Sequence, residues 1–130
     1  MYFYYKRLHE DAQEPTRATI DSAGYDVYAV KDTTIPPLTT VSVCLGIAVT
    51  PPIGYYLRIT NRSSMALNEN VVVNADVVDP DYTGELHVII LNSHPVYFYH
   101  INKGDRIGQI VFTAFVSPKA IETDNLPITR

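Results

Sequence analysis

Short segments rich in β-branched and aromatic residues recur along the whole chain, at roughly ten-residue spacing and with proline or glycine between them. Strands of this length, each bounded by turn residues, are typical of β-sandwiches, jelly rolls and barrels. No part of the sequence alternates strand-like and helix-like segments, so a parallel α/β sheet is not expected. With 130 residues the chain is long enough for one domain with its own hydrophobic core. The sequence therefore predicts a single all-β domain.

The pattern predicts about eight to ten short strands, in which apolar and polar residues alternate as they do in half-buried strands. One long β-branched run, residues 39–49, is expected to bend at Gly46. At most one short helical segment is expected, near residues 65–69. Residues 118–130 are mostly polar and predict a C-terminal arm after a domain at 1–117. The other expected strands cover residues 2–8, 23–29, 55–60, 71–73, 86–91, 96–101 and 106–116.

Charge and cysteine content narrow the class of protein. The formal net charge of −4 argues against a basic face, so no direct nucleic-acid partner is expected. The single cysteine, Cys44, lies in an apolar run and is interpreted as a small core residue in a reducing compartment. No apolar run is long enough to span a membrane, and the first residues lack the order of a signal peptide. An intracellular protein, cytoplasmic or nuclear, is therefore expected, of cellular or viral origin.

The most informative stretch covers residues 74–85 and contains three aspartates, a proline, a tyrosine and a glycine. Two β-branched runs, 71–73 and 86–91, flank it, and this arrangement predicts a hairpin. Such a hairpin presents the carboxylate of Asp79 beside the ring of Tyr82. Aspartate and glycine also cluster in solvated turns for local reasons, so a plain turn is the alternative interpretation.

A second stretch, Asn61-Arg-Ser-Ser-Met-Ala66, follows an expected strand. Arg62 offers a planar fork of N–H donors that suits phosphate oxygens, and Ser63 and Ser64 add hydroxyl groups. If a helical turn begins there, its free backbone N–H groups also favour an anion. Gln109, on the last expected strand, can donate an amide N–H to a phosphate. The alternatives are a surface ion pair for Arg62 and a half-buried polar strand residue for Gln109.

Four motifs in this sequence resemble, in order and at compatible spacing, the signature of the trimeric dUTPase family. Each motif alone is modest evidence, whereas the four together cover most of the chain and are specific. The motifs are Ala23-Gly-Tyr-Asp-Val-Tyr-Ala29, Asn61-Arg-Ser-Ser-Met-Ala66, Val77-Val-Asp-Pro-Asp-Tyr-Thr-Gly84 and Lys103-Gly-Asp-Arg-Ile-Gly-Gln109.

The resemblance implies a fold, an activity and an assembly. The fold would be a jelly-roll-like distorted barrel of the dUTPase-like, β-clip type, assembled as a homotrimer with active sites between subunits. The reaction would be hydrolysis of dUTP to dUMP and pyrophosphate, by attack of water on the α-phosphate, with Mg²⁺ as the cofactor. This activity keeps uracil out of DNA and supplies dUMP for dTMP synthesis.

The resemblance also implies roles for particular residues. Asp79 is the expected catalytic residue, a general base that holds and deprotonates the attacking water. Asp26 is expected to meet Mg²⁺ through water. Tyr82 is expected to pack on the deoxyribose and leave no room for a 2′-hydroxyl. The phosphate-binding set is Arg62, Ser63, Ser64 and Gln109, and the nucleoside-binding set is Asn74, Asp76, Val77, Val78, Tyr82 and His87.

Ordinary structural roles remain open for several of these residues. The Asp26 carboxylate can satisfy nearby backbone N–H groups, Tyr82 can belong to the core, and His87 can be a plain strand residue. Asp81 is interpreted as a structural carboxylate that pairs with Arg106 or another basic residue.

Two departures from the family pattern leave other functions open. Asp76 stands where the family usually has glycine, three residues before Asp79. The glycine-rich fifth motif is not found in the 130 residues, and we expect a flexible arm after position 130 rather than a true end there. The alternatives are a non-catalytic dUTPase-like protein that binds a protein partner and a relative of dCTP deaminase. The retained Asp79 and Tyr82 argue against both.

Overall fold

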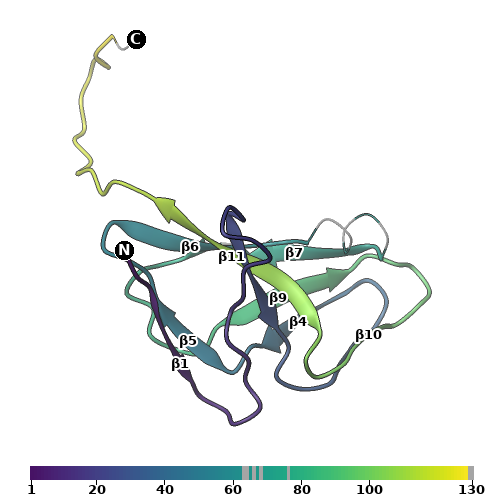
Figure 1. Cartoon of the computed structure of the whole chain (residues 1–130). Helices are drawn as coiled ribbons and strands as arrows, with labels where there is room; N and C mark the ends of the chain where they lie inside the picture. Colours follow the sequence, from purple (N-terminus) through teal and green to yellow (C-terminus); the bar gives the residue numbers. More distant parts are fainter. Residues whose placement is uncertain (63–64, 66, 68, 76, 129–130) are drawn as a thin grey trace.

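The structure is a computed structural model, and it describes residues 1–62, 65, 67, 69–75 and 77–128 (Figure 1). The described residues form an all-β fold of short antiparallel strands, as the sequence predicted. The strands are β1 Tyr4–Arg7, β2 Gly24–Tyr28, β3 Thr33–Ile35, β4 Thr39–Cys44, β5 Ile47–Thr50, β6 Tyr55–Thr60, β7 Val71–Ala75, β8 Val77–Val78, β9 His87–Asn92, β10 Tyr99–Ile101 and β11 Arg106–Ala114.

Two sheets carry the residues of interest. One has the strand order β2-β11-β6-β8 and the other the order β4-β9-β7. Two smaller sheets pair β1 with β5 and β10 with β3. None of these sheets closes on itself, so the barrel is a distorted and open one.

The expected hairpin is confirmed, because β7 pairs with β9 in antiparallel register from Val71 opposite Asn92. The segment between β7 and β9 also contains a further short strand. Val77 and Val78 form β8, which leaves the hairpin and pairs with Leu57 and Arg58 of β6 in the other sheet. A bulge between Val73 and Ala75 precedes this change of sheet, and bulges re-aim the residues that follow them.

The run at 39–49 is divided at the expected place. Gly46 has a φ of 72° and separates β4 from β5. An added Cβ at Gly46 would lie 2.8 Å from a methyl group of Val30. Both the backbone angle and the close packing therefore require glycine here.

Other strand boundaries differ from expectation. The pattern missed β3 and β8, which have three and two residues and are too short to show a periodicity. The expected strand at 96–101 is reduced to β10, because Val96, Tyr97 and Phe98 lie exposed in the turn before it.

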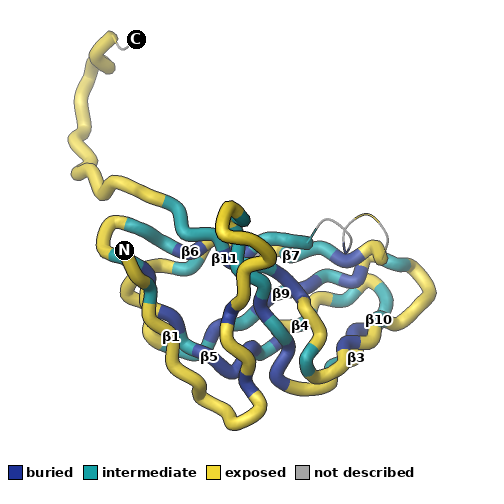
Figure 2. Tube along the Cα trace, in the orientation of Figure 1, coloured by how far each residue is buried: buried dark blue, intermediate teal, exposed yellow. Residues whose placement is uncertain are grey.

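The core lies between the sheets and consists of aliphatic side chains (Figure 2). In β9 the buried residues Val88 and Ile90 alternate with the half-buried His87 and Ile89. This period of two sends one face of the strand into the core and leaves the other face for a site. The buried hydrophobic residues are Ala12, Val27, Ala29, Val30, Ile35, Val43, Leu45, Ile47, Val49, Leu57, Ile59, Met65, Val71, Leu86, Val88, Ile90, Ile101, Ile107 and Ile110.

The segment after β6 holds the helical geometry that the structure describes. The Glu69 N–H donates a 3.2 Å hydrogen bond to the Met65 carbonyl, which is the spacing of an α-helical turn. Met65 is buried in the core and Leu67 is exposed. Part of this segment lies outside the described residues. In the part of the chain that is described, no helix has the length and apolar character needed to cross a membrane.

The chain leaves the sheets after β11. Residues 115–128 are exposed and form no strand or helix, and Figures 1 and 2 show this segment running away from the body of the molecule. Phe115 still contacts the body, through a hydrogen bond from its N–H to the Gly54 carbonyl and an edge-on contact with Tyr56.

Candidate functional site

A pocket of about 330 Å³ opens where β4, β8 and β9 meet. It contains five residues that the sequence nominated from the third motif and its neighbourhood, namely Val77, Val78, Asp79, Tyr82 and His87. The structure thus brings the expected general base and most of the expected nucleoside contacts to one cavity. Ser42, Glu85, Leu86 and Ile89 complete its lining.

Local hydrogen bonds hold the ring of Tyr82 in place. The Tyr82 N–H donates to the Asp79 carbonyl at 3.1 Å, which closes a turn. The Tyr82 hydroxyl donates to the Glu85 carbonyl at 2.7 Å. An added Cβ at Gly84 would lie 2.9 Å from the Tyr82 hydroxyl oxygen, so glycine is required there for this ring position. Tyr82 is 43% exposed and is therefore not a core residue, which removes the core alternative.

The Asp79 carboxylate is at the rim of this pocket and is exposed. The two residues before it are fixed by β8, in which Val78 lies opposite Leu57 and Val77 opposite Arg58. The aspartate therefore follows a paired strand and precedes a hydrogen-bonded turn, although its own side chain stays accessible to solvent. A carboxylate so placed can hold a water molecule at the mouth of the pocket.

His87 lies on the pocket side of β9. Its Nδ1 is 3.1 Å from the Ser42 hydroxyl and 3.6 Å from the Cys44 sulfur. Asn74 does not line the pocket, because its side chain is exposed and its amide lies 3.5 Å from the Thr40 hydroxyl. Ser63, Ser64 and Asp76 lie outside the described residues.

A second group of polar residues gathers where β2, β11 and the end of β6 adjoin. The Asp26 carboxylate is 3.3 Å from Nη1 of Arg106 and 4.0 Å from Nε of Arg62. Gln109 lies opposite Asp26 on one side and Thr60 on the other. Three of the expected phosphate or metal residues are described. Asp26 and Gln109 come from the adjacent strands β2 and β11, and Arg62 follows β6, the strand next to β11.

Gln109 is held by its neighbours on both sides. Its Nε2 donates to the Asn61 carbonyl at 3.2 Å. Its side chain also lies over Gly24, where an added Cβ would be 2.3 Å from Oε1 of Gln109. The first glycine of the first motif therefore makes room for the amide of the fourth motif.

The expected partner of Asp81 is corrected by this arrangement. Arg106 pairs with Asp26, and none of the ion pairs between described residues involves Asp81. Asp81 is an exposed turn residue. The β2–β11 register explains the pairing, since Arg106 lies opposite Tyr28 and close to Asp26 across the two strands.

Several contacts within these two groups were not predicted from the sequence. Ser42 and Ile89 line the pocket because they are opposite each other in the β4–β9 pairing. Arg106 joins Asp26 across eighty positions of sequence. The alternation of buried and partly exposed residues in β4 and β9 could have shown on which face of the sheet Ser42 and Ile89 lie. It could not have shown that this face borders Asp79.

The two groups lie in opposite directions along β6. Asp79 follows β8 toward the Tyr56 end of β6, because the pairing is antiparallel, whereas Arg62 follows the other end of β6. The six residue-to-residue steps from Tyr56 to Arg62 span roughly 20 Å if the chain stays extended. In a single chain, Asp79 therefore belongs to the pocket and Arg62 to the separate group around Asp26.

The group around Asp26 fits a hydrated magnesium ion in one respect. Mg²⁺ prefers oxygen ligands and keeps several of its waters, so a single carboxylate can hold it through water. The Asp26 side chain is 19% exposed and is flanked by two arginines. The residues present suit an ion that arrives with an anionic ligand, rather than an ion caged by protein oxygens.

Comparison with known proteins agrees with the motifs. The sequence model of the dUTPase family matches residues 10–130. The deoxyuridine 5′-triphosphate nucleotidohydrolase of Yarrowia lipolytica is 36% identical over 125 residues, which are 95% of this chain and 79% of the yeast protein. The enzyme of the same name from Paramecium bursaria Chlorella virus 1 is 40% identical over 113 residues, which are 87% of this chain and 79% of the viral protein. Relatives therefore occur in cells and in viruses.

Solved structures show the same fold. A mutant dUTPase from phage phi11 of S. aureus, described with a structural Mg(II) ion, superposes with a TM-score of 0.92 at 22% identity, over 97% of this chain and 99% of that one. A mutant dUTPase of Staphylococcus bacteriophage 80alpha with dUpNHpp gives a TM-score of 0.93 at 22% identity, over 99% of this chain and 92% of that one. At these identities the structures support the fold, while the family match and the sequence relatives decide membership. This chain belongs to the dUTPase family.

Proposed function

We propose that this protein hydrolyses dUTP to dUMP and pyrophosphate, with Asp79 as the general base. The observation that carries the proposal is the pocket in which Asp79 and Tyr82 are held side by side by the turn between β8 and β9. A water held by the Asp79 carboxylate attacks the α-phosphorus, and its proton passes to that carboxylate. The bond from the α-phosphorus to the bridging oxygen breaks, and pyrophosphate leaves.

The pocket supplies the selectivity for a deoxyuridine. The Tyr82 ring, fixed by its hydroxyl bond to the Glu85 carbonyl, packs against the deoxyribose and leaves no space for a 2′-hydroxyl. Main-chain N–H and C=O groups of residues 74–78 read the edge of uracil. A rigid hairpin rejects the methyl group of thymine more sharply than a soft apolar wall does. Val77, Val78 and His87 line the same space.

The triphosphate is bound by the second group. Arg62 and Gln109 donate to phosphate oxygens, with Ser63 and Ser64 from the same motif. Arg106, which the sequence suggested only as a partner of Asp81, adds a second guanidinium beside Arg62. Mg²⁺, when bound, would offset the charge of the phosphates, and Asp26 would hold it through water.

The protein works as a homotrimer with sites shared between subunits. The support is the separation along β6, which keeps Asp79 and Arg62 of one chain in two separate groups. A threefold assembly solves this by presenting Asp79 of one subunit to Arg62 of the next.

The decisive experiment measures pyrophosphate release from dUTP in the presence of Mg²⁺, with dTTP, dCTP and UTP as competing candidates. It is run on the 130-residue chain and on the chain with any residues that follow position 130 in its gene. Selective release from dUTP supports the proposal. Deamination of dCTP, or release from no nucleotide by either chain, contradicts it.

The role of Asp79 is tested in the same assay with Asp79→Asn. Loss of a general base lowers turnover by about 100- to 10,000-fold, while binding of the unreactive analogue dUpNHpp should stay nearly unchanged. Asp21→Asn, which removes the same charge from an exposed loop, is the matched control. Undiminished turnover in Asp79→Asn would remove Asp79 from the role of base.

A further inference from the structure

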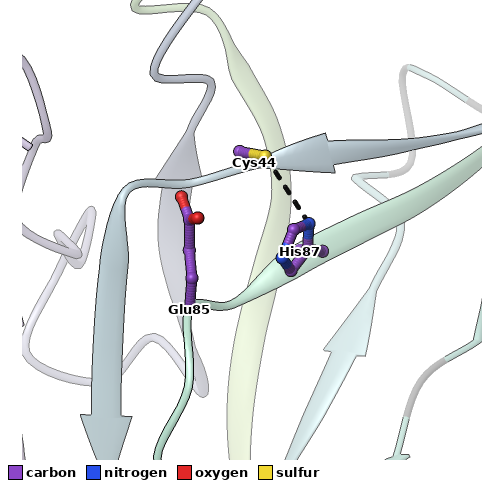
Figure 3. A group of neighbouring side chains, drawn as sticks. All are labelled: Cys44, Glu85 and His87. Carbon is purple, nitrogen blue, oxygen red and sulfur yellow. Dashed lines mark hydrogen bonds between the residues drawn. The ribbon is translucent and has the colours of Figure 1, made fainter. Parts of the chain in front are cut away.

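Three side chains with metal-binding atoms converge beside the pocket, on the outer face of the sheet β4-β9-β7. They are Cys44 at the end of β4, His87 at the start of β9 and Glu85 two residues before it (Figure 3). Their sulfur, nitrogen and carboxylate oxygen atoms all lie within 4.8 Å of one another. We propose that Cys44, Glu85 and His87 form a binding site for Zn²⁺.

The strand pairing accounts for the convergence of the sulfur and the imidazole. Cys44 and His87 are directly opposite each other in the antiparallel β4–β9 ladder. Residues opposite each other in such a pair project their side chains from the same face of the sheet. The neighbours Val43 and Val88 are buried on the other face. The cysteine is half-buried and packs against the edge of the core, which agrees in part with its interpretation as a core residue.

The distance between the two atoms fits a shared zinc ion. The Cys44 sulfur lies 3.6 Å from Nδ1 of His87. With Zn–S near 2.3 Å and Zn–N near 2.1 Å, tetrahedral coordination places the sulfur and the nitrogen about 3.6 Å apart. A zinc ion can thus be placed between them without movement of either strand.

The carboxylate is also held in a suitable position. One oxygen of Glu85, Oε2, accepts a 2.9 Å hydrogen bond from the Gly46 N–H, in the turn that follows Cys44. This bond orients the side chain toward the sulfur and leaves Oε1 available as a ligand, in the way that outer partners commonly fix metal-binding carboxylates. The fourth position is open to water, because Cys44 and Glu85 also line a second, open pocket of about 600 Å³.

The donor set selects the kind of ion. A thiolate and an imidazole are soft to intermediate ligands that favour Zn²⁺ over Mg²⁺, which prefers oxygen. On binding, the sulfur–hydrogen bond of Cys44 breaks, a sulfur–zinc bond forms and the proton leaves to solvent. No electron is transferred, so the step needs no oxidant or reductant.

A zinc ion at this position would alter the shape of the proposed active site. This consequence rests on the proposed function. Glu85 and His87 line the 330 Å³ pocket together with Asp79 and Tyr82. Drawing the two side chains toward an ion changes one wall of the nucleoside pocket. Zinc and nucleotide are therefore expected to oppose each other's binding, and by thermodynamic linkage to the same extent.

The test begins with a titration of the reduced, metal-free protein with Co²⁺, which takes zinc sites and reports its ligands by absorption. The expected result is one ion per chain with a sulfur-to-cobalt charge-transfer band, and its displacement by Zn²⁺ but not by Mg²⁺. Cys44→Ala should abolish the band and weaken Zn²⁺ binding by at least about 100-fold, since loss of an outer partner alone costs about 10- to 100-fold. Cys44→Ser, which keeps the side-chain volume, should behave in the same way.

The matched control is His100→Ala. His100 is also a strand histidine with its Nδ1 beside a hydroxyl group, that of Thr34, but it belongs to the separate β10-β3 sheet. The variant should bind Co²⁺ like the unchanged protein. Absence of the band in the unchanged protein, or its survival in both Cys44 variants, would overturn the site and leave a thiol–imidazole hydrogen bond only.

A second measurement separates this inference from the proposed function. Binding of dUpNHpp is measured with and without saturating Zn²⁺, at constant Mg²⁺. If Zn²⁺ weakens the binding of dUpNHpp and Cys44→Ala abolishes this weakening, the expected opposition between zinc and nucleotide is supported. If Zn²⁺ leaves the binding of dUpNHpp unchanged, the opposition is overturned, but the proposed zinc site is not. Failure of the analogue to bind without Zn²⁺ would contradict the proposed function, and the cobalt band would still decide the site.

Discussion

Arg106 donates from Nη1 to Oδ2 of Asp26 at 3.3 Å, across the β2–β11 pairing, although eighty positions of sequence separate the two residues. Arg62 approaches the other oxygen of the same carboxylate at 4.0 Å. Without nucleotide, the two guanidinium groups therefore share one negative charge. In the proposed function, a polyphosphate would bind the two guanidinium groups in place of Asp26 and would leave this carboxylate available for hydrated Mg²⁺.

Asp26→Asn should raise the Mg²⁺ concentration needed for half-maximal dUTP hydrolysis, because the variant cannot attract the hydrated ion. The free energy of unfolding should change by only about 1 kcal/mol or less, since partly exposed ion pairs contribute little. Activity is measured against Mg²⁺ concentration and stability by urea unfolding, with Asp21→Asn as the control for charge. An unaltered Mg²⁺ dependence would assign Asp26 to the structure alone.

Mixed trimers should show whether Asp79 and Arg62 act from different subunits. Asp79→Asn and Arg62→Ala should each be nearly inactive alone. When the two chains are unfolded together and refolded in equal amounts, roughly a quarter of the sites should pair an intact Asp79 with an intact Arg62. Activity is measured after the mixture is shown to be trimeric by sedimentation.

The opposite result is expected if each active site is formed within one chain. If both residues serve a site within one chain, mixing cannot restore activity, because every chain carries one defect. Two samples of the same variant mixed in the same way give the baseline. Recovery well above that baseline can come only from shared sites.

Substitutions of Tyr82 should separate its ring from its hydroxyl. Tyr82→Phe keeps the ring and loses the hydrogen bond to the Glu85 carbonyl, which should cost about 1 kcal/mol of stability. Tyr82→Ala removes the ring, so UTP hydrolysis should rise relative to dUTP. The ratio of kcat/KM values for the two nucleotides is the measurement. A change of that ratio in Tyr82→Phe as large as in Tyr82→Ala would show that the hydroxyl, not the ring, sets selectivity.

Gly24→Ala should act through Gln109. The added methyl group would lie 2.3 Å from Oε1 of Gln109, so the amide must leave its position beside the Asn61 carbonyl. We expect a rise in KM for dUTP comparable with that of Gln109→Ala. In the double variant the two effects should not add, since both remove the same contact. Additive losses would mean that Gly24 serves the backbone rather than the amide.

Tyr99 should make stability fall at alkaline pH. Burial, above all, and the hydrogen bond that its hydroxyl donates to Glu69 at 2.8 Å raise the pKa of Tyr99 well above its ordinary value. The folded protein therefore keeps this proton when the unfolded chain loses it. The stabilisation is complete below about pH 10, the ordinary tyrosine pKa, and is lost progressively as the pH rises above it.

Tyr99→Phe should remove this part of the alkaline loss, although it lowers stability near neutral pH. Urea unfolding of both proteins between neutral pH and pH 11 gives the comparison. Tyr97→Phe is the matched control, because Tyr97 is exposed in the turn before β10 and should leave the pH dependence unchanged. Parallel curves for Tyr99→Phe and the unchanged protein would contradict the assignment.

The sequence alone was sufficient for the fold class and for most of the pocket. Alternation of apolar residues gave β6 its exact bounds at Tyr55–Thr60 and predicted the pairing of β7 with β9. The turn chemistry of residues 79–84 placed Asp79 beside Tyr82, because proline and glycine act locally on the backbone. These features depend on neighbours in sequence, and a pattern read along the chain contains them.

Only the tertiary structure decided which distant residues meet. The change of β8 from the hairpin to β6, the contact of Arg106 with Asp26 and the convergence of Cys44 with His87 all depend on cross-strand register. Register is set by the packing of whole sheets against a common core, and a shift of one residue would turn each side chain to the opposite face. The motifs therefore indicated the family and the candidate residues, and the pairing of the strands determined which of these residues share a site.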